Sequence, residues 1–201
     1  MKSSHLIACL AIVVTVFGRA DLRAQTETYQ AALSGPNESP SNASPGTGFA
    51  TVTINPTTNI LNVVVSFGGL IGTTTASHIH AATAVPFAGT AGVATATPTF
   101  PGFPLGVTSG SYAMSFDMSQ ASTWNLAFIT ANGGTAAGAE AAFIAAVRQG
   151  RSYLNIHTTS FSSGEIRGFL VAAPVPENGT NAILMLLAVG ALLLARRHQS
   201  A

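Results

Sequence analysis

The sequence predicts an all-β domain, a β-sandwich of immunoglobulin-like or superoxide-dismutase-like form with about eight strands and one inserted helix. Apolar and polar residues alternate along 50–54 and again along 61–67, and the segment between them, 55–59 (Asn-Pro-Thr-Thr-Asn), supplies turn residues. Only 136–149 carries apolar residues at helical spacing. Short strands joined by Gly- and Pro-rich turns, with a single helix among them, are typical of two-layer β folds.

The expected strands follow one another along the middle of the chain. They cover residues 27–34, 50–54, 61–67, 77–82, 91–97, 112–118, 152–158 and 165–171. The helix at 136–149 ends before Gly150, a residue that favours the conformation of a helix C-cap. Residues 35–48 and 98–106 are rich in Gly and Pro, and we expect them to be surface loops.

The first 24 residues have the composition of a secretory signal peptide. Lys2 is followed by an apolar stretch at 6–16 and by small residues up to Ala24. Cys9, the only cysteine, lies inside this segment, so we expect no disulfide in the remainder of the chain. The sequence therefore predicts that the following domain, residues 25–174, is exported across the inner membrane.

The C-terminal segment, residues 175–201, combines an apolar stretch with a basic end. Residues 182–195 are apolar, and Arg196 and Arg197 follow them directly. At about 1.5 Å per residue this stretch reaches roughly 21 Å, so flanking residues or a thinned bilayer must complete a membrane span. Arginines beside a span belong in the cytoplasm. We therefore expect a transmembrane helix that anchors the chain in the membrane with its domain outside.

The domain itself carries little charge. Residues 25–174 hold three basic and five acidic residues, which gives a net charge of −2, and they contain no lysine. Proteins that bind nucleic acid neutralise phosphates with clustered Lys and Arg. This composition excludes nucleic acid as a partner.

Histidine is concentrated in two short motifs of the domain. His78 and His80 form a His-x-His pair, and His157 lies further along the chain in an Asn-Ile-His-Thr segment. Residues two apart on a strand share a face, so His78 and His80 point the same way, and Ile79 between them points into the core. If their strand pairs near that of His157, the three imidazoles converge.

The Gly-Glu-Ile-Arg-Gly motif at 164–168 follows the third histidine closely. In a hairpin whose apolar residues face the core, Glu165 and Arg167 share the outer face with Asn155 and His157. The sequence therefore predicts a polar cluster of Asn155, Glu165 and Arg167 beside the histidines.

Three interpretations of this cluster stay open. Neutral imidazoles at His78, His80 and His157 suit copper or zinc, with a carboxylate such as Glu165 holding the far nitrogen of a ring. The same residues also suit a structural network that fixes strand register, or a ligand site without metal. No Gly-x-Ser-x-Gly nucleophile motif is present.

The order of these motifs resembles the CHRD domain, which is named for chordin and occurs widely in bacterial exported proteins. The resemblance extends over about residues 29–172 and rests on Ser-His-Ile-His-Ala (77–81), Gly-Val-Thr-Ser-Gly-Ser-Tyr (106–112), a helix, Tyr-Leu-Asn-Ile-His-Thr (153–158) and Gly-Glu-Ile-Arg-Gly-Phe-Leu (164–170). It implies a β-sandwich with distant likeness to copper-zinc superoxide dismutases, and it carries no established bacterial activity.

The tail resembles the PEP-CTERM class of bacterial sorting signals, including its VPDSG-like variants. Val175, Pro176 and Glu177 precede the apolar stretch and the arginine pair. This resemblance implies recognition by an exosortase-type processing enzyme. It also implies release or transfer to the outer envelope or extracellular matrix, often in bacteria that make extracellular polysaccharide.

Two functions are compatible with these observations. The first is a non-enzymatic binding or structural module of the cell envelope, with a polysaccharide or a protein as ligand. The second is an extracytoplasmic metalloprotein, redox-active if it holds copper, that uses His78, His80 and His157 to bind copper or zinc. The lack of a recognisable catalytic arrangement favours a binding module over an enzyme.

Overall fold

The structure, a computed structural model, describes residues 26–174 and confirms a mostly β fold with eight strands. The strands are β1 (Glu27–Ser34), β2 (Thr47–Asn55), β3 (Ile60–Gly68), β4 (Thr74–Ala81), β5 (Gly110–Asp117), β6 (Ser152–Thr158), β7 (Ile166–Phe169) and β8 (Val171–Ala172). The helices are α1 (Leu126–Ala131) and α2 (Ala136–Arg148), and short 3-10 turns cover Gly35–Asn37 and Ala121–Thr123. The strands expected at 27–34 and 152–158 have the bounds of β1 and β6.

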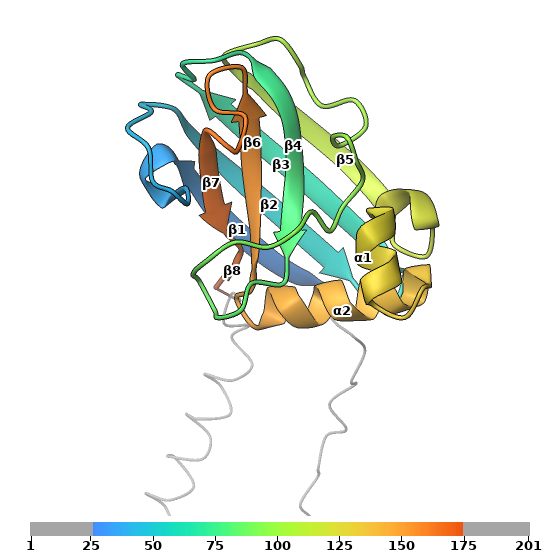
Figure 1. Cartoon of the computed structure of the whole chain (residues 1–201). Coiled ribbons are helices and arrows are strands. Elements are labelled where there is room, and N and C mark those ends of the chain that lie inside the picture. The colour runs from blue at the N-terminus through green and yellow to red at the C-terminus, as the bar shows by residue number, and fades with distance from the viewer. Residues whose placement is uncertain (1–25, 175–201) are drawn as a thin grey trace, which may run out of the picture.

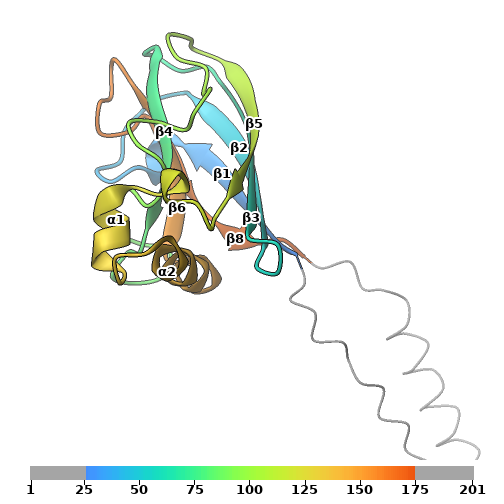
Figure 2. The same ribbon diagram turned by 90° about the vertical axis from the view of Figure 1, so that its right-hand side faces the viewer.

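The strands form one sheet that curls into two layers. Its hydrogen-bonded order is β4-β6-β7-β1-β2-β3-β5, and β8 also pairs with β1. β7 pairs with β1 at a single residue pair, Ser34 and Arg167, and the sheet folds from one layer into the other at this point. β4, β6 and β7 form one layer, and β1, β2, β3 and β5 form the other (Figures 1 and 2). The predicted sandwich is confirmed in outline as a sheet folded onto itself.

The hydrophobic core lies between these two layers. Val52 of β2 and Val63 of β3 belong to the same buried cluster as Ile79 of β4 and Leu154 of β6. Each such side chain contributes about 1.5–3 kcal/mol when it leaves water. Because neighbours on a strand point to opposite faces, a buried Ile79 directs the residues on either side of it to the outer face.

The two helices close one end of the sandwich (Figure 1). α2 confirms the expected helix; Thr135 caps its N-terminus, and Phe143 and Val147, one turn apart, are buried. α1 was not expected, because six residues are too few to show a helical period. Its signal is Asn125, whose side chain caps the helix. The expectation of a single helix is therefore wrong.

Residues 91–97, expected to form a strand, run irregularly along the outer edge of β4. They take part only in isolated bridges, one of them between His80 and Val93. Three consecutive residues, Ala94, Thr95 and Ala96, are buried, whereas a regular strand alternates between its two faces. β-Branched residues two apart, Val93, Thr95 and Thr97, favour a strand here, but the burial of the segment does not alternate.

The strand expected at 165–171 is divided in two. β7 pairs with β6, and β8 pairs with β1. Between them, the Leu170 amide donates to the Ser152 carbonyl oxygen, and the Leu170 side chain is buried. The chain thus changes partners at Leu170, where it passes from one layer to the other.

Two segments expected to be surface loops carry buried residues. Glu38 and Ser44 of 35–48 are buried, and so are Phe100 and Phe103 of 98–106. Single inward-pointing residues within Gly- and Pro-rich sequence create no period, so the pattern could not mark them. The first of these loops supplies two side chains to the polar sites described below.

Within residues 26–174 no helix has the length and apolar character needed to cross a membrane. The predicted signal peptide at 1–24 and the predicted transmembrane helix at 182–195 lie outside the described residues. The predicted sorting residues Val175, Pro176 and Glu177, and the anchoring Arg196 and Arg197, also lie outside them.

Candidate metal centre

The histidines of the described domain meet on the outer face of the β4-β6-β7 layer. His78 and His80 flank the core residue Ile79 on β4, and His157 lies on the adjacent strand β6. Ring centroids are 5.9 Å apart for His78 and His80, 5.3 Å for His78 and His157, and 6.2 Å for His80 and His157. One ring nitrogen from each histidine lies within 4.8 Å of the other two. The convergence that the sequence predicts is therefore present.

Each of the three rings turns one nitrogen toward a backbone carbonyl oxygen. The pairs are His78 Nε2 with Pro98 at 2.6 Å, His80 Nδ1 with Ala91 at 2.8 Å, and His157 Nδ1 with Ser162 at 2.9 Å. A carbonyl oxygen only accepts hydrogen bonds, so each of these nitrogens carries the ring proton. The opposite nitrogen of each neutral ring is therefore bare.

The bare nitrogens are buried. His78 Nδ1 and His157 Nε2 have no hydrogen-bond partner, although an unpaired buried acceptor costs about 1–3 kcal/mol. His80 Nε2 lies 3.1 Å from Asn155 Oδ1. Burial lowers the pKa of His78 to about 4 and also lowers the pKa of His80 and of His157. All three rings are thus neutral at pH 7, the state in which imidazole binds metal.

Loops supply the carbonyl groups that orient the rings. Ala91 and Pro98 belong to the segment between β4 and β5, and Ser162 belongs to the turn between β6 and β7. The segment wrongly expected to be a strand, 91–97, is therefore part of what encloses the cluster. Its irregular path places the carbonyl group of Ala91 against His80, and that of Pro98, the residue directly after it, against His78.

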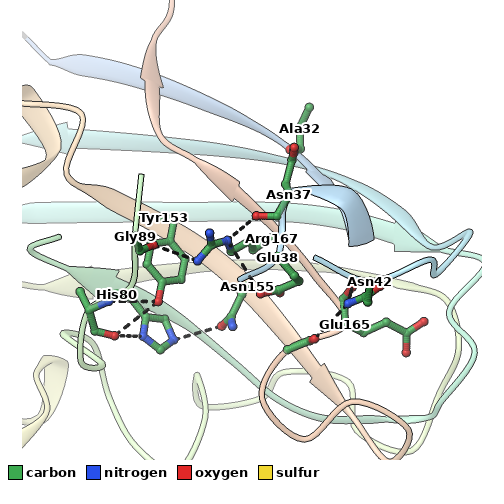
Figure 3. A network of polar contacts seen from close by, with 12 residues as sticks. Ala32, Asn37, Glu38, Asn42, His80, Gly89, Tyr153, Asn155, Glu165 and Arg167 are labelled. Atoms are coloured by element: carbon green, nitrogen blue, oxygen red, sulfur yellow. Dashed lines mark hydrogen bonds and ion pairs between the residues drawn. The ribbon is translucent and has the colours of Figure 1, made fainter. Parts of the chain in front are cut away.

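Arg167 fixes one side of the cluster through a stack of side chains. It lies opposite Asn155 in the β6–β7 register. Its guanidinium carbon lies 4.7 Å from the centre of the Tyr153 ring, and that ring stacks on His80 at 4.7 Å with a 5° tilt. The guanidinium also donates to the carbonyl oxygen of Gly89 at 3.1 Å (Figure 3). The stack restricts the rotation of the His80 ring.

The ionic partner of Arg167 is Glu38, which the sequence did not predict. Arg167 Nε lies 3.8 Å from Glu38 Oε2, and both side chains are almost fully buried. Burial raises the pKa of Glu38 to about 7, against the lowering effects of Arg167 and of a hydrogen bond from Asn155. Glu38 lies in a loop without periodicity. The only sequence feature that distinguishes Glu38 is that it is one of five acidic residues in 25–174.

Glu165 does not join this cluster, and the prediction that it shares a face with Arg167 and the histidines is wrong. Its carboxylate accepts hydrogen bonds from four groups: Ser44 Oγ and Ile71 N at 2.6 Å, Thr158 Oγ1 at 2.6 Å and Gly72 N at 3.1 Å. Thr158 follows His157 on β6 and so points to the opposite face. Figure 3 shows the Glu165 side chain directed away from Arg167.

The two glycines of the Gly-Glu-Ile-Arg-Gly motif are explained by packing. Gly164 has a φ of +131°, and a Cβ there would lie 2.5 Å from Glu38 Oε1 and 2.7 Å from Asn155 Nδ2. The bend at Gly164 takes Glu165 out of the alternation that governs β7. A Cβ on Gly168 would collide with the carbonyl oxygen of Ala32. The two glycines therefore let the Glu38 side chain approach the backbone at Gly164, and the backbone of β1 at Ala32 approach Gly168.

The fold and the site together define a small β domain with a curled eight-stranded sheet and a histidine triad in which His78 and His80 are buried. The family profile of the CHRD domain matches residues 29–170. The match covers more than half of the chain, and the chain therefore belongs to the CHRD domain family. No curated protein and no solved structure gives a significant match.

Proposed function

We propose that this CHRD-domain protein is a non-enzymatic binding module whose ligand is a copper or zinc ion held by His78, His80 and His157. The observation that carries the proposal is that three histidine rings converge, with one nitrogen of each within 4.8 Å of the others, and that two of the bare ring nitrogens have no partner. Metal-binding histidines commonly donate their other ring N–H to a carbonyl or carboxylate, which is the arrangement of all three rings. A purely structural cluster would satisfy its buried acceptors.

The donor set supports the choice of metal. Imidazole nitrogen suits copper and zinc, whereas magnesium and calcium take oxygen ligands. Bonds of 2.0–2.1 Å to a tetrahedral ion would separate two nitrogens by about 3.3 Å. The nitrogens of the triad lie within 4.8 Å of one another, so small side-chain rotations would bring them to that spacing. The likeness to copper-zinc superoxide dismutases that the family implies points to the same metals and stays a prediction.

Metal analysis of the protein, purified without a polyhistidine tag, tests the proposal. We expect one equivalent of zinc or copper in the wild type and loss of that metal in His80→Ala and His157→Ala. Ser163→Ala is a matched control, because Ser163 is exposed and lies in the turn that follows His157. Circular dichroism establishes that each variant stays folded.

Two results would overturn the metal site. A folded wild type that takes up neither zinc nor copper from excess metal would exclude it. Full stoichiometry in folded His80→Ala and His157→Ala would show that the metal binds elsewhere. If His80→Ala unfolds although the wild type never held metal, the cluster is structural.

We further propose that the chain works in the bacterial cell envelope, anchored by its C-terminal helix or released by an exosortase. The support is the signal-peptide composition of 1–24, the Val-Pro-Glu segment at 175–177 and the arginines that follow the apolar stretch. A polysaccharide or protein of the envelope as an additional partner also stays a prediction.

Expression of the full chain in hosts with and without an exosortase tests the envelope proposal. We expect the mature N-terminus near residue 25 in both hosts, and a C-terminus near residue 177 only where the enzyme is present. A chain that keeps residues 1–24 and stays in the cytoplasm would contradict export. A tail that stays intact beside an active exosortase would contradict sorting.

A further inference from the structure

Asn155 lies among the three histidines. It precedes His157 by two residues on β6, so the two side chains share a face, and it is directly opposite His78 in the β4–β6 register. Its side chain also contacts His80, and the residue is almost fully buried. Asn155 is thus a neighbour of every member of the triad.

The contact between Asn155 and His80 joins two hydrogen-bond acceptors. His80 donates its Nδ1–H to the carbonyl oxygen of Ala91, so its Nε2 is bare. The atom that faces this nitrogen at 3.1 Å is Asn155 Oδ1. The amide nitrogen of Asn155 faces the Glu38 carboxyl group beside Gly164. Two lone pairs therefore point at each other in a buried place.

Rotation of the amide removes the conflict only if Glu38 carries a proton. With the amide turned, its nitrogen would donate to His80, but Oδ1 would then face the carboxyl group of Glu38, which can donate only when it is protonated. The row formed by Glu38, Asn155 and His80 has an acceptor at both ends, and the amide can donate toward only one of them. With Glu38 ionised in its ion pair with Arg167, the row lacks one cation. The bare nitrogens of His78 and His157 place that cation at the histidine end.

On the basis of the metal site proposed above, we propose that Asn155 Oδ1 is the fourth ligand of the ion and that Glu38 holds the amide in the orientation this requires. The separation of 3.1 Å between Oδ1 and His80 Nε2 is close to the roughly 3.3 Å expected for two ligands of one tetrahedral ion. Glu38, which faces the amide nitrogen of Asn155, is held in turn by its ion pair with Arg167.

Two properties follow from an amide oxygen in the fourth position. Oxygen is a harder donor than thiolate or thioether, so the site would prefer Zn²⁺ or Cu²⁺ to Cu⁺. Four protein ligands also leave no position for a substrate, whereas catalytic zinc sites with three ligands keep one open. Asn155 would therefore make this a site that holds its metal without catalysis.

Cobalt(II) is a suitable probe, because its visible absorption reports changes in coordination. In the wild type loaded with Co²⁺ we expect no spectral change on addition of azide, since the coordination is complete. In Asn155→Ala we expect azide to bind and shift the spectrum, and the affinity for Zn²⁺ to fall about tenfold or more. Asn125→Ala is the matched control, because Asn125 caps α1 and makes no contact with the triad.

Asn155→Asp covers the case in which Asn155→Ala does not fold. It keeps an oxygen at the same place, so we expect it to exclude azide and to bind Zn²⁺ at least as tightly as the wild type. A wild type that binds azide would overturn the assignment of Asn155 and leave the three-histidine site standing. Metal retained at full stoichiometry in folded His80→Ala and His157→Ala would instead overturn the site itself.

Discussion

Two buried polar clusters lie on opposite faces of the β6–β7 hairpin, and they are built on different principles. Around Glu165, four donors surround one carboxylate. Around His157, three rings converge, and each has one nitrogen against a backbone carbonyl oxygen and the other nitrogen bare. The first cluster has all the donors its charge requires, and the second leaves two buried nitrogens, His78 Nδ1 and His157 Nε2, without a partner.

This difference is the basis for proposing a structural role for the Glu165 cluster and a binding role for the histidine triad. Burial alone would raise the pKa of Glu165, but the hydrogen bonds from Ser44, Thr158 and the amides of Ile71 and Gly72 lower it overall. The cluster ties three loops to the sheet without help from a ligand. In the histidine triad, two buried ring nitrogens receive no hydrogen bond from the protein. We therefore propose the binding role for the triad.

The largest effect is expected from Glu165→Ala. The substitution leaves four donors without their acceptor, so the free energy of unfolding of the metal-free protein should fall by about 3 kcal/mol or more. Urea denaturation measures the change, with Ser163→Ala as the control. A loss below about 1 kcal/mol would show that the Glu165 cluster is not the structural one.

The next effect distinguishes the histidine cluster. Zinc at about 100 times its dissociation constant should raise the free energy of unfolding of the wild type by about 2.7 kcal/mol. The same zinc concentration should leave the unfolding of His157→Ala unchanged, because the triad has lost a ligand. Thermal unfolding with and without zinc provides the measurement. An equal shift in both proteins would mean that the stabilisation comes from another site.

The contrast between the clusters also explains what sequence could and could not predict. The alternation around Ile79 and Ile156 sufficed to place His78, His80, Asn155 and His157 on one outer face, because strand geometry is local. The position of Glu165 depends on the bend at Gly164, two residues before β7 begins, which breaks the alternation. A period of two cannot reveal such a bend.

Residues that reach the site from loops were beyond prediction for a related reason. Glu38, Ala91 and Pro98 act through long-range packing, and two of them contribute only a carbonyl oxygen, which every residue has. The segment 91–97 has β-branched residues two apart, at Val93, Thr95 and Thr97, and this spacing predicts a strand. Its actual place is set by contacts with β4 and with the histidines.

A further effect concerns pH, and it is smaller than the two above for each pH unit. His78 has a pKa of about 4 in the folded protein and about 6.5 when unfolded, so the unfolded chain takes up its proton first as the pH falls. Between pH 6.5 and 4 His78 should therefore lower stability by about 1.4 kcal/mol per pH unit. Glu38, whose pKa is raised to about 7, acts in the opposite direction, since its protonated form is favoured in the fold.

His78→Gln isolates this contribution. Its free energy of unfolding, measured in urea between pH 7 and pH 4.5 without metal, should decline less steeply with falling pH than that of the wild type. Parallel curves for the two proteins would contradict a neutral, buried His78.

The smallest effect is expected at a polar pair that belongs to neither cluster. Arg148 of α2 forms an ion pair with Glu27 of β1, and its side chain is 53% exposed. Exposed pairs contribute about 0.2–1 kcal/mol and weaken with salt. Arg148→Ala should therefore change the urea midpoint only slightly, and less still in 1 M salt. A loss as large as that of Glu165→Ala would remove the distinction drawn between buried and exposed networks.

The pairing of β8 with β1 has a mechanical consequence. Tyr29 lies opposite Ala172, so the chain enters and leaves the domain on neighbouring strands. Tension applied through the two ends would act first on this short ladder, and the residue pairs between β8 and β1 would separate one after another. β4 and β6 do not lie between the two points of attachment, so the histidines would keep their positions while the first contacts gave way.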